Sequence, residues 1–163
     1  MYSKDELKEL RLTFWQNFKS YCETQSILNY KKKRWILNET QIRGVALRFE
    51  LERENAKVIF EIQNKHEDRR LQIFEILERY KVVVEEGFET GLIWEFYHQR
   101  EDNNQEVCRI YSQLENIDWH NQNQWTIIYD FFIKNMLQME DNFLMVKEVV
   151  KEELRNVEWK NVE

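Results

Sequence analysis

Apolar and polar residues alternate most clearly over residues 44–63, which read GVALRFELERENAKVIFEIQ. Two alternating runs flank the polar stretch 53–56, and this arrangement predicts a β-hairpin. Because successive side chains of a strand point to opposite faces, each run has one apolar face and one mainly polar face. The polar faces carry Arg48, Glu50, Lys57 and Glu61, which predicts cross-strand pairs of opposite charge.

Three other stretches repeat their apolar residues every three or four positions, which predicts α-helices over residues 1–22, 65–86 and 123–155. Ser3 and Glu6 form a capping box for the first helix. Asn64 is the expected N-cap of the second helix, and Gly87 its expected C-terminal cap. Asn121 and Gln124 suggest a third capping box before the last helix.

A second pair of alternating runs lies within residues 92–114 and predicts another hairpin, with a polar loop over residues 100–105. The expected order is therefore helix, hairpin, helix, hairpin, helix, within a single domain of residues 1–163. Four antiparallel strands with helices on one face would make a two-layer α+β domain of order α-ββ-α-ββ-α. Residues 23–37 have no clear period, and their structure stays open.

The charge and composition of the chain exclude several classes of function. The net charge of −6 argues against a strongly basic nucleic-acid-binding protein, because phosphate neutralisation needs clustered Lys and Arg. The basic run of residues 31–34 is interpreted as a solvated stretch rather than a nuclear signal or a phosphate-binding patch. The beginning of the chain shows no apolar signal region, no window approaches a membrane-spanning length, and two cysteines make no disulfide framework. We therefore expect a cytoplasmic protein without membrane contact.

Four segments add a resemblance to a family: MYSKDELKELRLTFWQNF, RFELERENAKVIFEIQ, LIWEF and NQNQWTIIYDFF. In this order they resemble the bacterial domain-of-unknown-function family 4268, from Met1 to about Phe143. The family has no established activity to transfer to a residue. Its relatives look like stand-alone small proteins, or like C-terminal modules behind restriction-type nuclease domains, which implies a context of genome defence or nucleic-acid processing. Thr126 departs from the proline that often follows the late Trp, and the segment before the first strand is unusual.

The sharpest enzyme hypothesis is a metal-dependent nuclease, because such sites place acids on neighbouring strands to hold Mg²⁺. Glu50 and Glu61 lie on adjacent strands and on one face, but Gln63 stands where the motif has a lysine. An ordinary sheet face, with Arg48 and Lys57 pairing the acids, is the favoured interpretation. The three histidines lie in separate contexts, and Cys108 is expected to be buried and inert. No catalytic residue, metal ligand or cofactor is predicted.

The second face of the predicted sheet is the candidate binding surface. Its residues are Arg48, Glu50, Glu61, Gln63, Glu95, Tyr97, Arg109 and Tyr111. Tyrosines and arginines suit stacking on bases and suit protein interfaces equally well, but the acids on the same face favour a protein partner, including a second copy of the chain. The sequence thus predicts a non-catalytic protein-interaction or accessory module. The alternative is a nucleic-acid-binding or nuclease-associated domain.

Three observations would separate these hypotheses. An interaction module needs an apolar patch that stays exposed in the monomer. A nucleic-acid-binding protein needs residues 31–34 and Arg109 gathered on one surface. An enzyme of the nuclease type needs Glu50 and Glu61 within reach of one metal ion, in a concave site.

Overall fold

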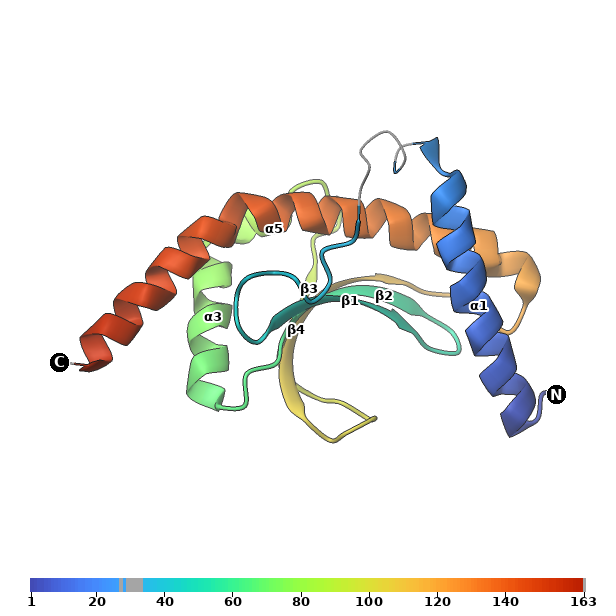
Figure 1. Cartoon of the computed structure of the whole chain (residues 1–163), viewed down its shortest axis with the longest axis horizontal. Coiled ribbons are helices and arrows are strands. Elements are labelled where there is room, and N and C mark those ends of the chain that lie inside the picture. The colour runs from blue at the N-terminus through green and yellow to red at the C-terminus, as the bar shows by residue number, and fades with distance from the viewer. Residues whose placement is uncertain (27, 29–33, 163) are drawn as a thin grey trace.

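The computed structural model describes residues 1–26, 28 and 34–162. It confirms an α+β fold in the predicted order, with the last helix closing the chain (Figure 1). The elements are α1 (Lys4–Thr24), β1 (Val45–Leu51), β2 (Ala56–Ile62), α3 (Glu67–Arg79), α4 (Lys81–Val84), β3 (Ile93–Gln99), β4 (Glu106–Leu114), η1 (Gln122–Gln124) and α5 (Trp125–Val162). Within the described ranges, no helix is long and apolar enough to cross a membrane.

The four strands form one antiparallel sheet in the order β1-β2-β4-β3. Both hairpins are therefore formed as predicted, and β2 and β4 pair at the centre. The side chains that β1, β2 and β4 direct toward the helices are mostly apolar and belong to one buried cluster with residues of α1, α3 and α5. The strands β1 and β3 are left at the two edges of the sheet.

An aromatic cluster joins α1 and α5 to the sheet. Phe132 of α5 lies at its centre, fully buried, with its ring 5.0 Å from the ring of Phe49 and 5.5 Å from the ring of Phe18. The ring of Trp15 stacks on Phe132 at 5.6 Å. Stacked and edge-to-face aromatic pairs of this kind stabilise a core beyond the area they bury. The cluster explains why the apolar stripe of the first helix is so rich in aromatic residues.

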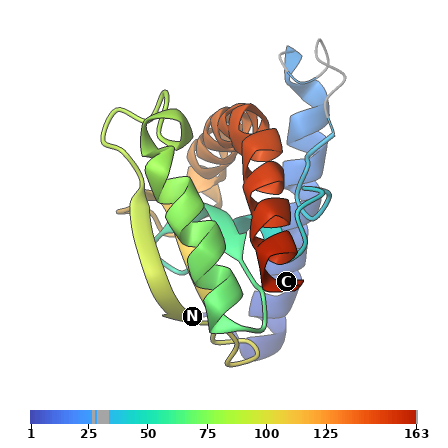
Figure 2. The same ribbon diagram turned by 90° about the vertical axis from the view of Figure 1, so that its left-hand side faces the viewer.

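The helix α5 runs across the whole domain and continues beside α3 (Figures 1 and 2). It has 38 residues, which makes it longer than the stretch 123–155 expected from the sequence. On one side of its C-terminal half, Val146, Val150 and Leu154 are buried. Arg79 of α3 forms an ion pair with Glu153 at 2.9 Å, so α3 gives this half of α5 a partner beyond the sheet.

Local signals at the helix ends were right in one case and wrong in others. Ser3 caps α1 by accepting a hydrogen bond from the Glu6 amide at 3.2 Å, as predicted. Asn64 does not cap α3: the helix begins after His66, and the Asn64 side chain donates to the Arg43 carbonyl at 3.1 Å. The Asn64 amide therefore binds the backbone of residue 43, just before β1, instead of the first turn of α3.

The predicted helix over residues 65–86 is two helices, because the backbone leaves the helical region at Tyr80 with φ −106° and ψ 26°. The C-cap of α4 is Glu85 rather than Gly87. Gly87 follows with φ +79°, and a Cβ at this position would lie 2.5 Å from the Gln138 side chain of α5. The positive φ favours glycine here, whereas the short contact involves only the end of the flexible Gln138 side chain, which can move aside. The side chain of Asn121 caps the short helix η1, which leads directly into α5.

Candidate functional site

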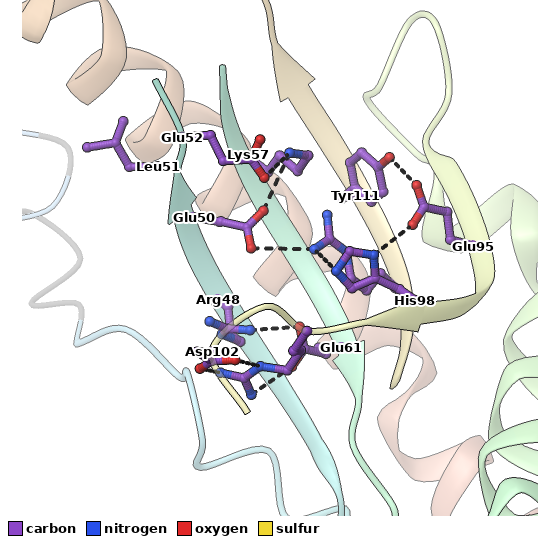
Figure 3. Close-up of polar contacts among 12 residues, drawn as sticks. Arg48, Glu50, Leu51, Glu52, Lys57, Glu61, Glu95, His98, Asp102 and Tyr111 are labelled. Atoms are coloured by element: carbon purple, nitrogen blue, oxygen red, sulfur yellow. Dashed lines mark hydrogen bonds and ion pairs between the residues drawn. The ribbon is translucent and has the colours of Figure 1, made fainter. Parts of the chain in front are cut away.

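The second face of the sheet is concave. The pairing of β3 with β4 is shifted between Glu95 and His98, and a β-bulge of this kind bends a strand and increases its twist. The loop after β3 therefore reaches across the face and places Asp102 near Arg48 (Figure 3). Arg100 of this loop approaches Glu61 of β2 to 3.4 Å. Ala46, Ile59 and Val107 are buried on this face, although no helix of the described residues covers it. The sequence analysis predicted a candidate binding surface on this face but gave no sign of its curvature.

One half of the charged site is built around Glu61, whose side chain is fully buried. Its Oε2 atom accepts a hydrogen bond from Arg48 Nη1 at 2.8 Å, and its Oε1 atom accepts one from Gln63 Nε2 at 2.9 Å. Arg100 binds Asp102 through Nη2 at 2.6 Å and Nε at 3.0 Å, and this interaction lowers the pKa of Asp102. Charge-assisted hydrogen bonds from Arg48 and Arg100 thus neutralise the buried carboxylate of Glu61.

The other half is built around Arg109, which is 2% exposed. Its Nη1 atom lies 3.4 Å from Glu50 Oε1 and 2.9 Å from His98 Nε2. Because a guanidinium group only donates, His98 Nε2 accepts this bond, and the histidine is the Nδ1–H tautomer. That Nδ1 atom faces Glu95 Oε2 at 3.5 Å.

Tyr111 joins the two strands β3 and β4 on the same face. Its hydroxyl donates to Glu95 Oε1 at 2.5 Å, and the Arg109 guanidinium lies 4.9 Å from the centre of its ring. Burial raises the pKa of Tyr111 to about 12, and the hydrogen bond to Glu95 adds to the shift. At neutral pH this phenol is therefore a fixed hydrogen-bond donor.

Lys57 completes the pairing of charges near the β1–β2 turn. Its Nζ atom lies 3.4 Å from Glu50 and 3.2 Å from Glu52, and it donates to Asn55 at 2.7 Å. The predicted cross-strand pairs of opposite charge are therefore confirmed on β1 and β2. We name the whole set the charged network. Its members are Arg48, Glu50, Glu52, Lys57, Glu61, Glu95, His98, Arg100, Asp102, Arg109 and Tyr111.

Of the eight residues predicted for this face, all but Tyr97 lie in or beside the charged network. Tyr97 is 60% exposed, and its hydroxyl donates to Glu106, which also pairs with Arg70 of α3 at 3.4 Å. The bulge in β3 turns this side chain toward the helical side. Glu61, Arg109 and Tyr111 are buried, so their binding of a partner stays a prediction that would require the face to open.

Besides Glu52, which directly follows β1, three network residues escaped the sequence reasoning: His98, Arg100 and Asp102. The first lies just after the bulge, where the strict alternation of a strand fails. The other two belong to the loop 100–105, which was predicted only as a polar loop between two strands. The short charged sequence Arg100-Glu101-Asp102 directly after a strand was the available signal, but nothing in the sequence shows that the loop folds back over the sheet.

The arrangement offers little for metal chemistry. Glu50 and Glu61 each direct their carboxylates at arginine or lysine, which occupy the positions that a cation would take. Over residues 1–26, 28 and 34–162, no three His, Cys, Asp or Glu side chains gather as metal ligands. Cys108 is buried as expected, and burial raises its pKa to about 11. A protonated, enclosed thiol is a poor nucleophile.

A hollow of about 370 Å³ opens beside the network, where the loop 100–105 faces the end of β1. It is lined by Arg11, Arg48, Glu50, Leu51, Glu52, His98, Arg100, Glu101 and Asp102. Positive and negative side chains share its walls, so it does not favour a ligand of one charge.

Comparisons with known proteins give one match. The model of a family described as "Domain of unknown function (DUF4268)" matches residues 10–147. No curated protein matches the chain, and no solved structure matches it either.

Proposed function

Since this chain belongs to the DUF4268 family, whose description assigns no activity, we propose its function from its surface: a non-catalytic module that binds another protein or a second copy of itself. The observation that carries the proposal is an apolar patch on α5. It consists of Leu144, Met145 and Val149, which are 50%, 75% and 38% exposed.

Met145 and Val149 are neighbours on the helix surface, because positions four apart lie about one turn apart, and Leu144 precedes Met145 directly in the chain. The exposed acids Glu148 and Glu152 lie next to them on the outside of α5. A group of large apolar side chains with a polar rim is the usual appearance of a protein-binding surface. The opposite side of the same helix segment is already buried by Val146, Val150 and Leu154, so the domain core does not need the patch.

The competing hypotheses find less support. The acids of the nuclease hypothesis, Glu50 and Glu61, are held by basic residues rather than aimed at a common point. Arg109, which a nucleic-acid-binding surface would need, is 2% exposed. Of the basic run, residues 31–33 lie outside the described residues, and Arg34 pairs with Glu39 at 3.3 Å. Nucleic-acid binding and association with a nuclease stay predictions without an observation in their favour.

The test places a photo-crosslinking amino acid at position 145 of the patch. The matched control carries it at Val82, which is 83% exposed on α4, outside the patch. After irradiation in extracts of the native host, we expect discrete adducts from position 145 and none from position 82. An adduct of twice the chain mass identifies a second copy, and mass spectrometry identifies any other protein.

A second measurement decides whether such adducts reflect binding. Sedimentation of the unmodified protein and of Met145→Glu, each with the identified partner, should show a complex that the substitution weakens at least tenfold. Equal labelling at positions 145 and 82, or a complex unchanged by Met145→Glu, overturns the proposed function. Circular dichroism checks that the substituted, exposed position leaves the fold intact.

A further inference from the structure

The outer edge of β1 has unused hydrogen-bonding groups beside a groove, on a different surface from the α5 patch. Two hydrogen bonds at the ends of the β1–β2 hairpin show which residues of β1 face β2. Gly44 accepts from the Gln63 amide, and the Glu52 amide donates to Asn55. Because hydrogen-bonded positions alternate along an antiparallel pair, the even-numbered residues of β1 bond to β2. The odd-numbered residues therefore direct their N–H and C=O groups away from the sheet. The Leu47 amide confirms this direction, because it donates outward to the Leu37 carbonyl at 3.0 Å.

The outward groups are covered at both ends of β1 but not at its centre. At one end Val45 donates to the Ile42 carbonyl, and Leu47 donates to Leu37. At the other end the Leu51 carbonyl accepts from Arg11 Nη1 at 3.3 Å. Within the described part of the chain, the outward N–H and C=O of Phe49 have no hydrogen-bond partner. Such a gap in an edge strand is a template for another strand.

A groove gives access to this gap. A hollow of about 440 Å³ lies along the edge and is lined by Trp15, Leu37, Asn38, Leu47, Arg48, Phe49, Gln63 and Arg100. Its walls differ in character. Trp15, Leu37 and Leu47 make an apolar side, whereas Arg48 and Arg100 supply the only charged groups of the lining, both positive.

Arg48 has hydrogen-bonding capacity to spare on this wall. It uses Nη1 for Glu61, and its Nε and Nη2 atoms have no partner among the described residues (Figure 3). Its side chain is 27% exposed and lines both this groove and the hollow beside the charged network. A guanidinium with two adjacent free donors binds a carboxylate in a planar, bidentate manner.

We propose that the open edge of β1 at Phe49 binds an extended segment of a partner protein by strand addition, with apolar and acidic residues alternating in that segment. The backbone of the segment hydrogen-bonds to Phe49. Because a strand points alternate side chains to opposite sides, its apolar residues face Trp15 and Leu37, while an acidic residue between them faces Arg48. The inference goes beyond the proposed function, because it concerns a separate surface and a specific class of ligand.

The test uses three synthetic heptapeptides and the unaltered protein. The first has alternating Val and Glu at its centre, the second has Lys in place of Glu, and the third is the first with N-methyl groups on alternate central amides. Fluorescence anisotropy should show binding of the first peptide. We expect at least tenfold weaker binding of the other two, because one loses the carboxylate and one loses the backbone donors.

Hydrogen exchange locates the bound peptide. The Phe49 amide should exchange at least tenfold more slowly with the Val/Glu peptide present, whereas the Ala56 amide at the far side of the hairpin should be unchanged. The Arg48→Met variant, checked for folding by circular dichroism, should bind the Val/Glu peptide about tenfold more weakly and lose its preference over the peptide with Lys in place of Glu.

Several results would overturn the proposal. These are absence of binding to the Val/Glu peptide at millimolar concentration, tolerance of N-methylation, or no change at Phe49. Protection of Phe49 that rises with protein concentration alone would assign the edge to a second copy of the chain instead. The Met145→Glu variant should bind the peptide as the unaltered protein does, so failure of this inference and failure of the α5 patch are distinguishable.

Discussion

Replacing Glu61 by glutamine tests whether the charged network stabilises the curved sheet. The carboxylate is fully buried, and its two oxygens accept from Arg48 at 2.8 Å and Gln63 at 2.9 Å, with Arg100 at 3.4 Å. Glutamine has nearly the same shape, but it replaces one acceptor oxygen with an NH₂ group. In either orientation that NH₂ group faces a donor of Arg48, Gln63 or Arg100, and the counter-charge of two arginines is lost.

The expected loss of unfolding free energy follows from the burial of Glu61 and the exposure of its partners. Removing one partner of a buried ion pair costs about 3–5 kcal/mol, and a hydrogen bond to a charged group contributes about 1.5–3 kcal/mol. The side chains of Arg48 and Arg100 keep exposures of 27% and 17%, and Arg100 retains Asp102, so water and this acid offset part of the loss. We therefore expect the free energy of unfolding to fall by about 2–4 kcal/mol, and Tm by roughly 5–15 °C.

The assay is urea unfolding at pH 7 followed by far-UV circular dichroism, with the slope m compared between variants. The matched control is Asp102→Asn, which makes the same chemical change on the same Arg100. Its carboxylate is 61% exposed, so water screens this ion pair and the loss of stability should be much smaller. Equal effects of the two substitutions, or a loss below about 0.5 kcal/mol for Glu61→Gln, would refute a stabilising role of the buried pairing.

Three further predictions concern the core and the backbone. Gly44→Ala should lower the free energy of unfolding by about 1–2 kcal/mol in the same assay, because φ is +83°. The new Cβ would also lie 2.3 Å from the Asn64 side chain, which would have to move. Phe132→Ala should cost about 3–5 kcal/mol, since it empties the centre of the aromatic cluster; an effect under about 1 kcal/mol would contradict that packing. Burial raises the pKa of Cys22 and Cys108 to about 11, so at pH 8 both thiols should react with a disulfide reagent far more slowly than in urea. The pKa values of both thiols are higher in the folded protein than in the unfolded chain. The stability that the thiols contribute is therefore complete below about pH 8.5 and is lost as pH rises toward 11. A series of urea midpoints at increasing pH checks this loss.

The sequence predicted the secondary structure well where apolar and polar residues alternate clearly, even though both faces of β2 are buried in the fold. Residues 45–51 and 56–62 show this, since their two-residue period matches the observed strands β1 and β2. The helical period over 65–86 could not reveal the break at Tyr80, because α3 and α4 both present apolar residues to α5 and the period continues through the break. Asn64 was misassigned because an amide that caps a helix can equally bond across a loop.

The candidate site was only partly predictable for a different reason. Alternation placed Arg48, Glu61 and Arg109 on one face, and the structure brings them together there. Alternation says nothing about curvature, however. One extra residue between Glu95 and His98 both turned Tyr97 away and closed the face, so side chains expected at an open surface are buried.

The helix α5 has a consequence for the order of folding. It spans about 57 Å, and its residues Phe132, Met136 and Phe143 fill the middle of the core against both hairpins. All four strands precede it in the chain, so during synthesis their apolar face stays without its main cover until α5 has been made. The earlier segments can pair as hairpins, but the hairpins cannot acquire a stable common core. We therefore expect the domain to fold after α5 has been made, with the two hairpins becoming stable together rather than in turn.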